Sequence, residues 1–154
     1  MKEAIEKAKE ELKRVDHLFY VSLKYTKTVD VIKSVIVRLI NVFEFSIDSL
    51  LLYMQNKKKI KEIPTNPITK SIEVRKLFED DAQLLEDIDL YLLLRRINRA
   101  EYTSAREFRK HVTMTATVDG KKMDITIETI QEYFERAKSF VERTNKLIHN
   151  IKDE

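Results

Sequence analysis

The chain has 154 residues, of which 43% are apolar, and this suits a single domain with one hydrophobic core. It contains no cysteine, which excludes disulfides, a thiol nucleophile and thiolate zinc sites and is compatible with a reducing compartment. No apolar run reaches the length needed to cross a bilayer, and Met1 is followed by Lys- and Glu-rich sequence. We therefore expect a cytoplasmic protein with no membrane partner.

Two long helices are predicted in the first part of the chain. Apolar residues recur at intervals of three and four from about residue 2 to residue 25, and again from about residue 29 to residue 59. The apolar residues of the second helix extend around most of its circumference. A helix this apolar is central, or it faces both a core and a partner chain, so we predict a homodimer with two-fold symmetry through this helix.

A polar stripe interrupts the apolar surface of the second predicted helix. Arg38, Asn41, Glu44 and Asp48 recur at intervals of three and four. They are either the solvated side of the helix, or a buried charged network or carboxylate site at a helix interface. The solvated side is the simpler interpretation and the one we favour.

A third and a fourth helix are predicted after a proline-containing loop. Asn66 is expected to cap a short helix with Pro67 at its first position, running to about residue 79. Its expected buried residues are Ile68, Ile72 and Phe78. The fourth helix should begin at Asp80 or Asp81 and continue to residues 95 and 96. Periodicity is then lost from residue 102 to residue 109, so no regular element is predicted there.

A β-hairpin is the clearest local prediction. Apolar and polar residues alternate on both sides of Asp119-Gly120, a dipeptide typical of a type I′ turn. That turn predicts the cross-strand pairs Val118 with Lys121, Ala116 with Met123, Met114 with Ile125, and Val112 with Ile127. Aspartate at the buried position 114 should therefore destabilise the protein, whereas aspartate at Thr115 on the outer face should be tolerated.

The last predicted helix follows the hairpin. Thr129 and Glu132 are spaced as in a capping box, and apolar periodicity continues to about Ile151. The predicted fold is mainly α, a five-helix bundle in a single domain of residues 1–154, with one β-hairpin at about residues 111–128 between the fourth and last helices.

The segment from residue 95 to residue 111 is strongly basic. It holds six cationic and two acidic side chains and so carries +4 of a whole-chain charge of +3. Such a segment is a candidate for contact with RNA or with an acidic protein partner. The candidate anion-binding residues are Arg95, Arg96, Arg99, Arg106, Arg109 and Lys110.

The same segment also has a purely structural interpretation. Its arginines would satisfy the last carbonyl groups of the fourth helix and pair with Glu101 and Glu107. Tyr102 and Phe108 would then pack beneath the hairpin.

Metal and cofactor sites are not predicted. The three histidines, His17, His111 and His149, lie far apart in the sequence and lack the partners of a metal centre. The single glycine cannot form a glycine-rich phosphate loop, which excludes nucleotide hydrolysis by such a motif. We expect no cofactor.

The residues around Arg106 resemble a motif of a known family. Four residues separate Arg106 from His111, a spacing similar to the Arg-x4-6-His signature of HEPN domains, which are small helical bundles found in toxin, CRISPR-associated and RNA-processing systems. Residues 94–102 also resemble the Leu/Arg/Asn-rich stretch near that signature. Arg143 and His149 fit the spacing as well, but would lie on different faces of a helix.

This resemblance implies a HEPN-like fold and a possible activity. Several family members are metal-independent endoribonucleases, in which the Arg and His meet at a dimer cleft. The family's chemistry implies that Arg106 would stabilise phosphate charge and His111 would handle protons during attack by the RNA 2′-hydroxyl. The chain also resembles small uncharacterised archaeal proteins with an Asp-His-Leu opening like residues 16–18 and a late basic-His-Val hairpin, which implies no activity.

Two functions are expected from these observations. The leading one is a non-catalytic binding or assembly module, dimeric, whose basic segment contacts RNA or an acidic protein. The alternative is a HEPN-type endoribonuclease that uses Arg106 and His111.

Overall fold

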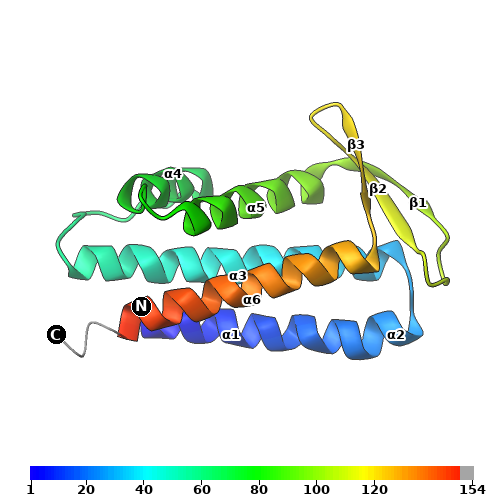
Figure 1. Cartoon of the computed structure of the whole chain (residues 1–154), viewed down its shortest axis with the longest axis horizontal. Coiled ribbons are helices and arrows are strands. Elements are labelled where there is room, and N and C mark those ends of the chain that lie inside the picture. Colours follow the sequence, from blue (N-terminus) through cyan, green and yellow to red (C-terminus); the bar gives the residue numbers. More distant parts are fainter. Residues whose placement is uncertain (150–154) are drawn as a thin grey trace.

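The computed structural model describes residues 1–149 as a helical bundle with a small antiparallel sheet at one end (Figure 1). Its elements are α1 (Lys2–His17), α2 (Leu23–Tyr25), α3 (Val29–Asn56), α4 (Pro67–Leu77), α5 (Ala82–Arg99), β1 (Glu101–Ala105), β2 (Thr113–Val118), β3 (Lys121–Ile125) and α6 (Ile127–His149). A π-helical turn, Leu18–Ser22, joins α1 to α2, so residues 2–25 form one helical segment. The expected class, mainly α with a β-hairpin, is confirmed.

Local capping explains where the short helices begin. The Asn66 side chain accepts hydrogen bonds from the backbone N–H groups of Ile68 (2.8 Å) and Thr69 (3.2 Å), as predicted. Asp81 caps α5 by accepting from the Leu84 N–H at 3.0 Å. α3 ends at Asn56, three residues before its predicted end, because the chain turns at Lys58, whose φ is 62°.

The apolar face predicted for α4 is only partly right, since Phe78 packs against the core but the two isoleucines do not face it. Ile68 and Ile72 are 41% and 53% exposed, and the buried residues are Ser71 and Val74. The Ser71 hydroxyl donates to the Pro67 carbonyl at 3.1 Å, so this small polar residue can be buried beside α3 without an unsatisfied group.

α6 begins earlier than predicted, and its capping residues are different. The Thr129 N–H donates to the Thr126 hydroxyl, and the Thr126 N–H donates to the Thr129 hydroxyl, both at 3.2 Å. The reciprocal pair of a capping box is therefore made by two threonines, and the expected pair of Thr129 with Glu132 is wrong. The predicted end near Ile151 lies outside the described residues.

The hairpin has the predicted turn and most of the predicted register. Asp119 and Gly120 both have positive φ, 52° and 79°, as a type I′ turn requires. The pairs Met114 with Ile125, Ala116 with Met123, and Val118 with Lys121 are confirmed. The pair Val112 with Ile127 is wrong, since β2 begins at Thr113 and Ile127 is the first residue of α6.

The prediction missed a third strand. β1 pairs with β2 in antiparallel register, from Glu101 opposite Thr117 to Ala105 opposite Thr113, and gives the sheet order β1-β2-β3. All five residues of β1 are exposed, so the strand has no apolar alternation by which periodicity could identify it.

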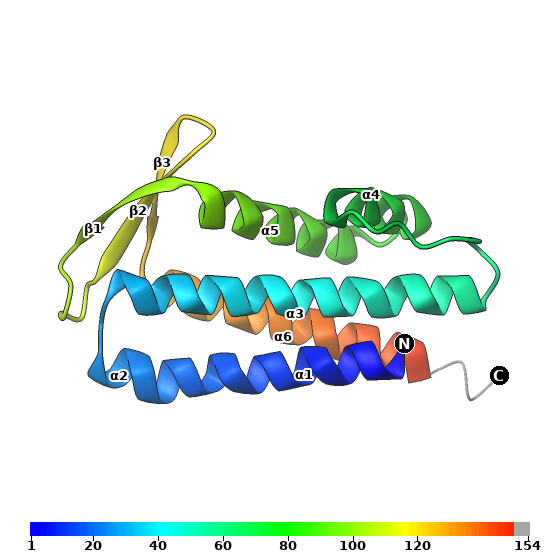
Figure 2. The same ribbon diagram turned by 180° about the vertical axis from the view of Figure 1, so that it is seen from behind.

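α3 occupies the centre of the bundle, with α1, α4, α5 and α6 packed around it (Figures 1 and 2). Phe43 of α3 lies 5.3 Å from the ring centre of Phe140 and 6.1 Å from that of Tyr91. Among the residues that the structure describes, Val37 is the one large apolar residue of α3 that is exposed. The excess of uncovered apolar surface from which we inferred a dimer is therefore absent. Across residues 1–149, no helix is both long enough and apolar enough to span a bilayer.

Candidate functional site

The polar stripe of α3 is half-buried at helix interfaces, so it is neither the fully solvated side that we favoured nor a fully buried network. Its first half surrounds Glu11 of α1, which is 4% exposed. Glu11 accepts hydrogen bonds from Arg38 at 3.1 Å, from Asn41 at 3.3 Å and from Arg14 of its own helix. One buried carboxylate thus holds two guanidinium groups, and the pairing compensates for its burial.

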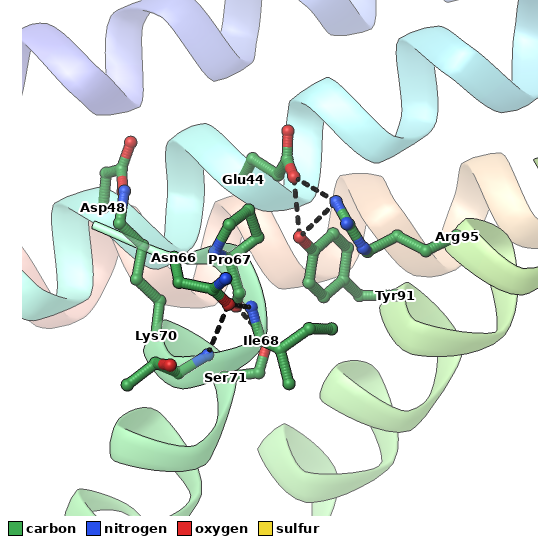
Figure 3. A network of polar contacts seen from close by, with 10 residues as sticks. Glu44, Asp48, Asn66, Pro67, Ile68, Lys70, Ser71, Tyr91 and Arg95 are labelled. Carbon is green, nitrogen blue, oxygen red and sulfur yellow. Dashed lines mark hydrogen bonds and ion pairs between the residues drawn. The ribbon is translucent and has the colours of Figure 1, made fainter. Parts of the chain in front are cut away.

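The second half of the stripe connects α3 to α4 and α5 (Figure 3). Glu44 accepts hydrogen bonds from the Tyr91 hydroxyl at 2.7 Å and from Arg95 at 3.0 Å, while Lys70 donates to Asp48 at 2.7 Å. Burial, together with the Glu44 carboxylate, raises the pKa of Tyr91, which keeps its hydroxyl protonated as a donor. The neighbouring pocket has a volume of about 160 Å³.

Two arginines of the basic segment pair with acidic side chains of this chain, Arg95 at a partly buried site and Arg96 on the surface. Arg95 binds Glu44, and Arg96 forms an ion pair with Asp119 in the hairpin turn, with 3.5 Å between Nε and Oδ2. Both partners differ from the expected Glu101 and Glu107. The position of Arg95 therefore favours a structural role over the predicted contact with an anion.

The other cations of the segment lie on exposed surface. No ion pair or side-chain hydrogen bond within residues 1–149 engages Arg99, Arg106, Arg109 or Lys110. The last three belong to the loop between β1 and β2, where Arg106 has a φ of 56° and Phe108 a φ of 65°. Positive φ is unfavourable for these residue types, so surrounding contacts must hold the loop in this conformation.

A backbone hydrogen bond joins this loop to the turn between α2 and α3. The Phe108 N–H donates to the Lys27 carbonyl at 2.6 Å. Beside it, the Lys33 ammonium lies 4.4 Å from the ring centre of Tyr102 in β1. Both views show the loop reaching this end of the bundle (Figures 1 and 2). Segments about 75 residues apart in the sequence are thereby brought together.

Exposed aromatic rings accompany the cations at this end. Tyr25 and Phe108 are 77% and 74% exposed, and Tyr102 is 38% exposed. The expectation that Tyr102 and Phe108 pack beneath the hairpin is therefore wrong. We call this surface the basic-aromatic end, and it comprises Lys24, Tyr25, Lys27, Lys33, Tyr102, Arg106, Phe108, Arg109 and Lys110.

The charge of this end exceeds what the loop alone supplies. Residues 24–33 and 101–110 together hold six cationic and three acidic side chains, a net charge of +3. The basic loop is evident in the sequence, but the contribution of residues 24–33 is not, because no local pattern links them to the loop. The sequence did offer one indication of this surface, because Tyr20 and Tyr25 lie off the apolar stripe of the first helix. Both tyrosines are highly exposed in the structure.

Arg106 and His111 of the suspected catalytic pair lie at opposite ends of the same exposed loop. The pKa of Glu128 is lowered, most by a hydrogen bond from its own backbone and then by one from the Thr126 side chain. The charges of His111 and Lys110 lower it further. The Glu128 carboxylate therefore interacts electrostatically with His111. Among the described residues, no group of three His, Asp and Glu side chains is arranged to hold a metal ion.

Comparison of this chain with protein-family models, with curated proteins and with solved structures finds no match in any of the three.

Proposed function

We propose that this protein is a non-catalytic binding module whose basic-aromatic end binds single-stranded RNA. One observation carries the proposal: exposed aromatic rings and cations occur together on one surface, and Arg106, Arg109 and Lys110 have no ion-pair partner within residues 1–149. Proteins that bind single strands combine positive charge along the backbone path with aromatic side chains on which bases stack. The charge alone would equally suit an acidic protein, but highly exposed rings such as Tyr25 and Phe108 suit unpaired bases.

The conformation of the loop supports this assignment. Phe108 has positive φ, and its N–H is tied to Lys27, so the backbone holds the ring outward although an apolar contact inside would be more favourable. Backbone strain of this kind is found at binding sites, where a rigid side chain lowers the entropy lost on binding.

Removing charge from the loop should weaken RNA binding in a salt-dependent way. We expect Arg106→Ala/Arg109→Ala to make the plot of log K against log salt shallower, reducing the magnitude of its slope by about 1 to 2. Each lost phosphate contact removes about one released counterion. Fluorescence anisotropy with a labelled oligouridylate at several salt concentrations measures the slope.

The matched control removes the same charge at the far end of α3. Lys59→Ala/Lys61→Ala changes two exposed lysines in the loop that follows α3 and should leave the slope near that of the wild type. Equal losses from both double variants would show that net charge, and not this surface, determines binding. A stable complex with an acidic protein but none with RNA would assign the surface to a protein partner.

The aromatic contribution can be separated from the charge. Phe108→Ala should reduce affinity for single-stranded RNA by about 1 to 3 kcal/mol, the range for loss of one stacked base, without changing the salt slope. Phe108→Tyr keeps the ring and should bind like the wild type. If the alanine variant bound as tightly as the wild type, base stacking at this position would be ruled out.

Catalysis and dimerisation remain separate predictions. Incubating RNA with the protein in chelator tests the ribonuclease alternative, which requires cleavage by the wild type and its loss in His111→Ala with RNA affinity retained. Every residue of the basic-aromatic end comes from one chain, so binding there does not require the predicted homodimer. Light scattering at tens of micromolar tests that dimer.

A further inference from the structure

A basic groove runs between α1 and α3, beside the basic-aromatic end. Its volume is about 800 Å³. Five basic side chains line it, namely Lys13, Arg14, His17, Lys33 and Arg38, and none of its lining residues in the described chain is acidic. The groove is not evident in the sequence, because its residues alternate with the buried residues of two separate helices.

Two arginines of the groove are held in place from below. Glu11, 4% exposed, binds Nη1 of Arg38 and Nη1 of Arg14, yet the two arginine side chains stay 43% and 54% exposed. Their Nε and Nη2 groups have no acceptor within the described chain. A guanidinium group fixed by a buried carboxylate, with donors left over, is preorganised to bind a phosphate through two parallel hydrogen bonds.

Lys33 links the groove to the basic-aromatic end. It lines the groove, and its ammonium also lies over the Tyr102 ring at 4.4 Å. From Lys33 the groove follows α3 as far as Asn41, a rise of about 12 Å at 1.5 Å per residue. Lys33 therefore joins the groove to β1 of the basic-aromatic end, and the exposed Val37 lies among the basic residues of the groove.

We infer that the α1–α3 groove binds the continuation of the RNA strand, with a phosphate held by Arg14 and Arg38. This inference rests on the proposed function and extends it to a second segment of the same ligand. A short oligonucleotide can occupy the basic-aromatic end alone, whereas a longer one reaches the groove.

The test compares oligouridylates of about 4 and about 12 nucleotides, which lie within the range of site sizes for single-strand binders. Arg14→Lys/Arg38→Lys keeps the charge but removes the planar fork. We expect this double variant to lose about tenfold or more in affinity for the long oligonucleotide and nothing for the short one, with an unchanged salt slope. Arg75→Lys/Arg136→Lys, the same exchange on α4 and α6, should bind both like the wild type.

A second variant covers the case in which the double variant folds poorly. Lys13 is exposed and has no partner within residues 1–149, so Lys13→Glu should leave the melting temperature unchanged and weaken binding of the long oligonucleotide selectively. Wild-type affinity of both groove variants for the long oligonucleotide would overturn the inference. Loss of long-strand binding in the groove variants but not in Arg106→Ala/Arg109→Ala would instead overturn the proposed function and leave the groove as the site. If the wild type bound neither length, both would be wrong.

Discussion

Replacing Arg143 by leucine is expected to lower the free energy of unfolding by about 3 to 5 kcal/mol at neutral pH. Arg143 of α6 forms an ion pair with Asp87 of α5, whose carboxylate is fully buried. Among residues 1–149, the substitution would leave that charge in the core with Gln83, at 3.5 Å, as its one side-chain hydrogen-bond donor. Chemical denaturation followed by circular dichroism measures the loss.

This loss should depend on pH in a defined direction. Burial already raises the pKa of Asp87 above its ordinary value, and the Arg143 guanidinium opposes that rise. Without Arg143 the folded-state pKa lies still further above the unfolded-state pKa. The folded form then favours the protonated carboxyl, so the penalty is full above the folded-state pKa and falls as the pH is lowered through it. The variant should therefore be closest to the wild type in acid.

Two controls isolate the buried charge as the cause. Lys146→Leu removes an exposed cation from the same helix and should change stability by no more than about 0.5 kcal/mol. Asp87→Leu/Arg143→Leu removes both charges and should recover much of the stability, because apolar pairs often replace buried ion pairs at little cost. A single variant as stable as the wild type at every pH would show that the ion pair has no role in the fold.

Replacing Met114 by aspartate should destabilise the protein by about 3 kcal/mol or more. Met114 is fully buried in β2 opposite Ile125, on the sheet face that packs against the helices. A carboxylate there would have no partner, and burial of an unpaired charge is among the few mechanisms that give losses of this size. Thermal and chemical denaturation both report it.

Thr117 is a better control position than Thr115, which the alternation of apolar and polar residues in the hairpin suggested. Thr115 lies on the other face, but its hydroxyl donates to Asp124 at 2.7 Å, so aspartate there would place two carboxylates opposite each other. Thr117 is exposed and lies between Lys122 of β3 and Glu101 of β1, so attraction to Lys122 offsets repulsion from Glu101 and Thr117→Asp should cost far less than Met114→Asp. Similar melting losses for Met114→Asp and Thr117→Asp would contradict the register.

Features that depend on a few neighbouring residues could be predicted from the sequence. Asn66 and Asp81 cap their helices because the donor groups lie two or three residues away, and Asp119-Gly120 forms its turn because both residues tolerate positive φ. The turn then determines the register of β2 and β3. The positions of the helices could be predicted from apolar periodicity, because a helix that packs against the core needs an apolar stripe along one side.

Features that depend on distant partners could not be predicted. β1 is exposed on both faces and forms because β2 supplies its hydrogen bonds. Arg38 and Asn41 looked solvated because their partner, Glu11, lies on another helix. The same limit applied to α4, whose buried side is set by how it packs on α3 and not by its most apolar residues.

The candidate site shows both cases together. The cations of the β1–β2 loop were visible in the sequence, because charge density is a local property. Only the tertiary structure determined that Arg95 is held by Glu44, and that Lys27 and Lys33 lie beside Phe108 and Tyr102. The physical reason is that hydrogen bonds and ion pairs between separate elements depend on how the helices pack around α3, and the apolar periodicity constrains that packing without specifying which polar residues meet.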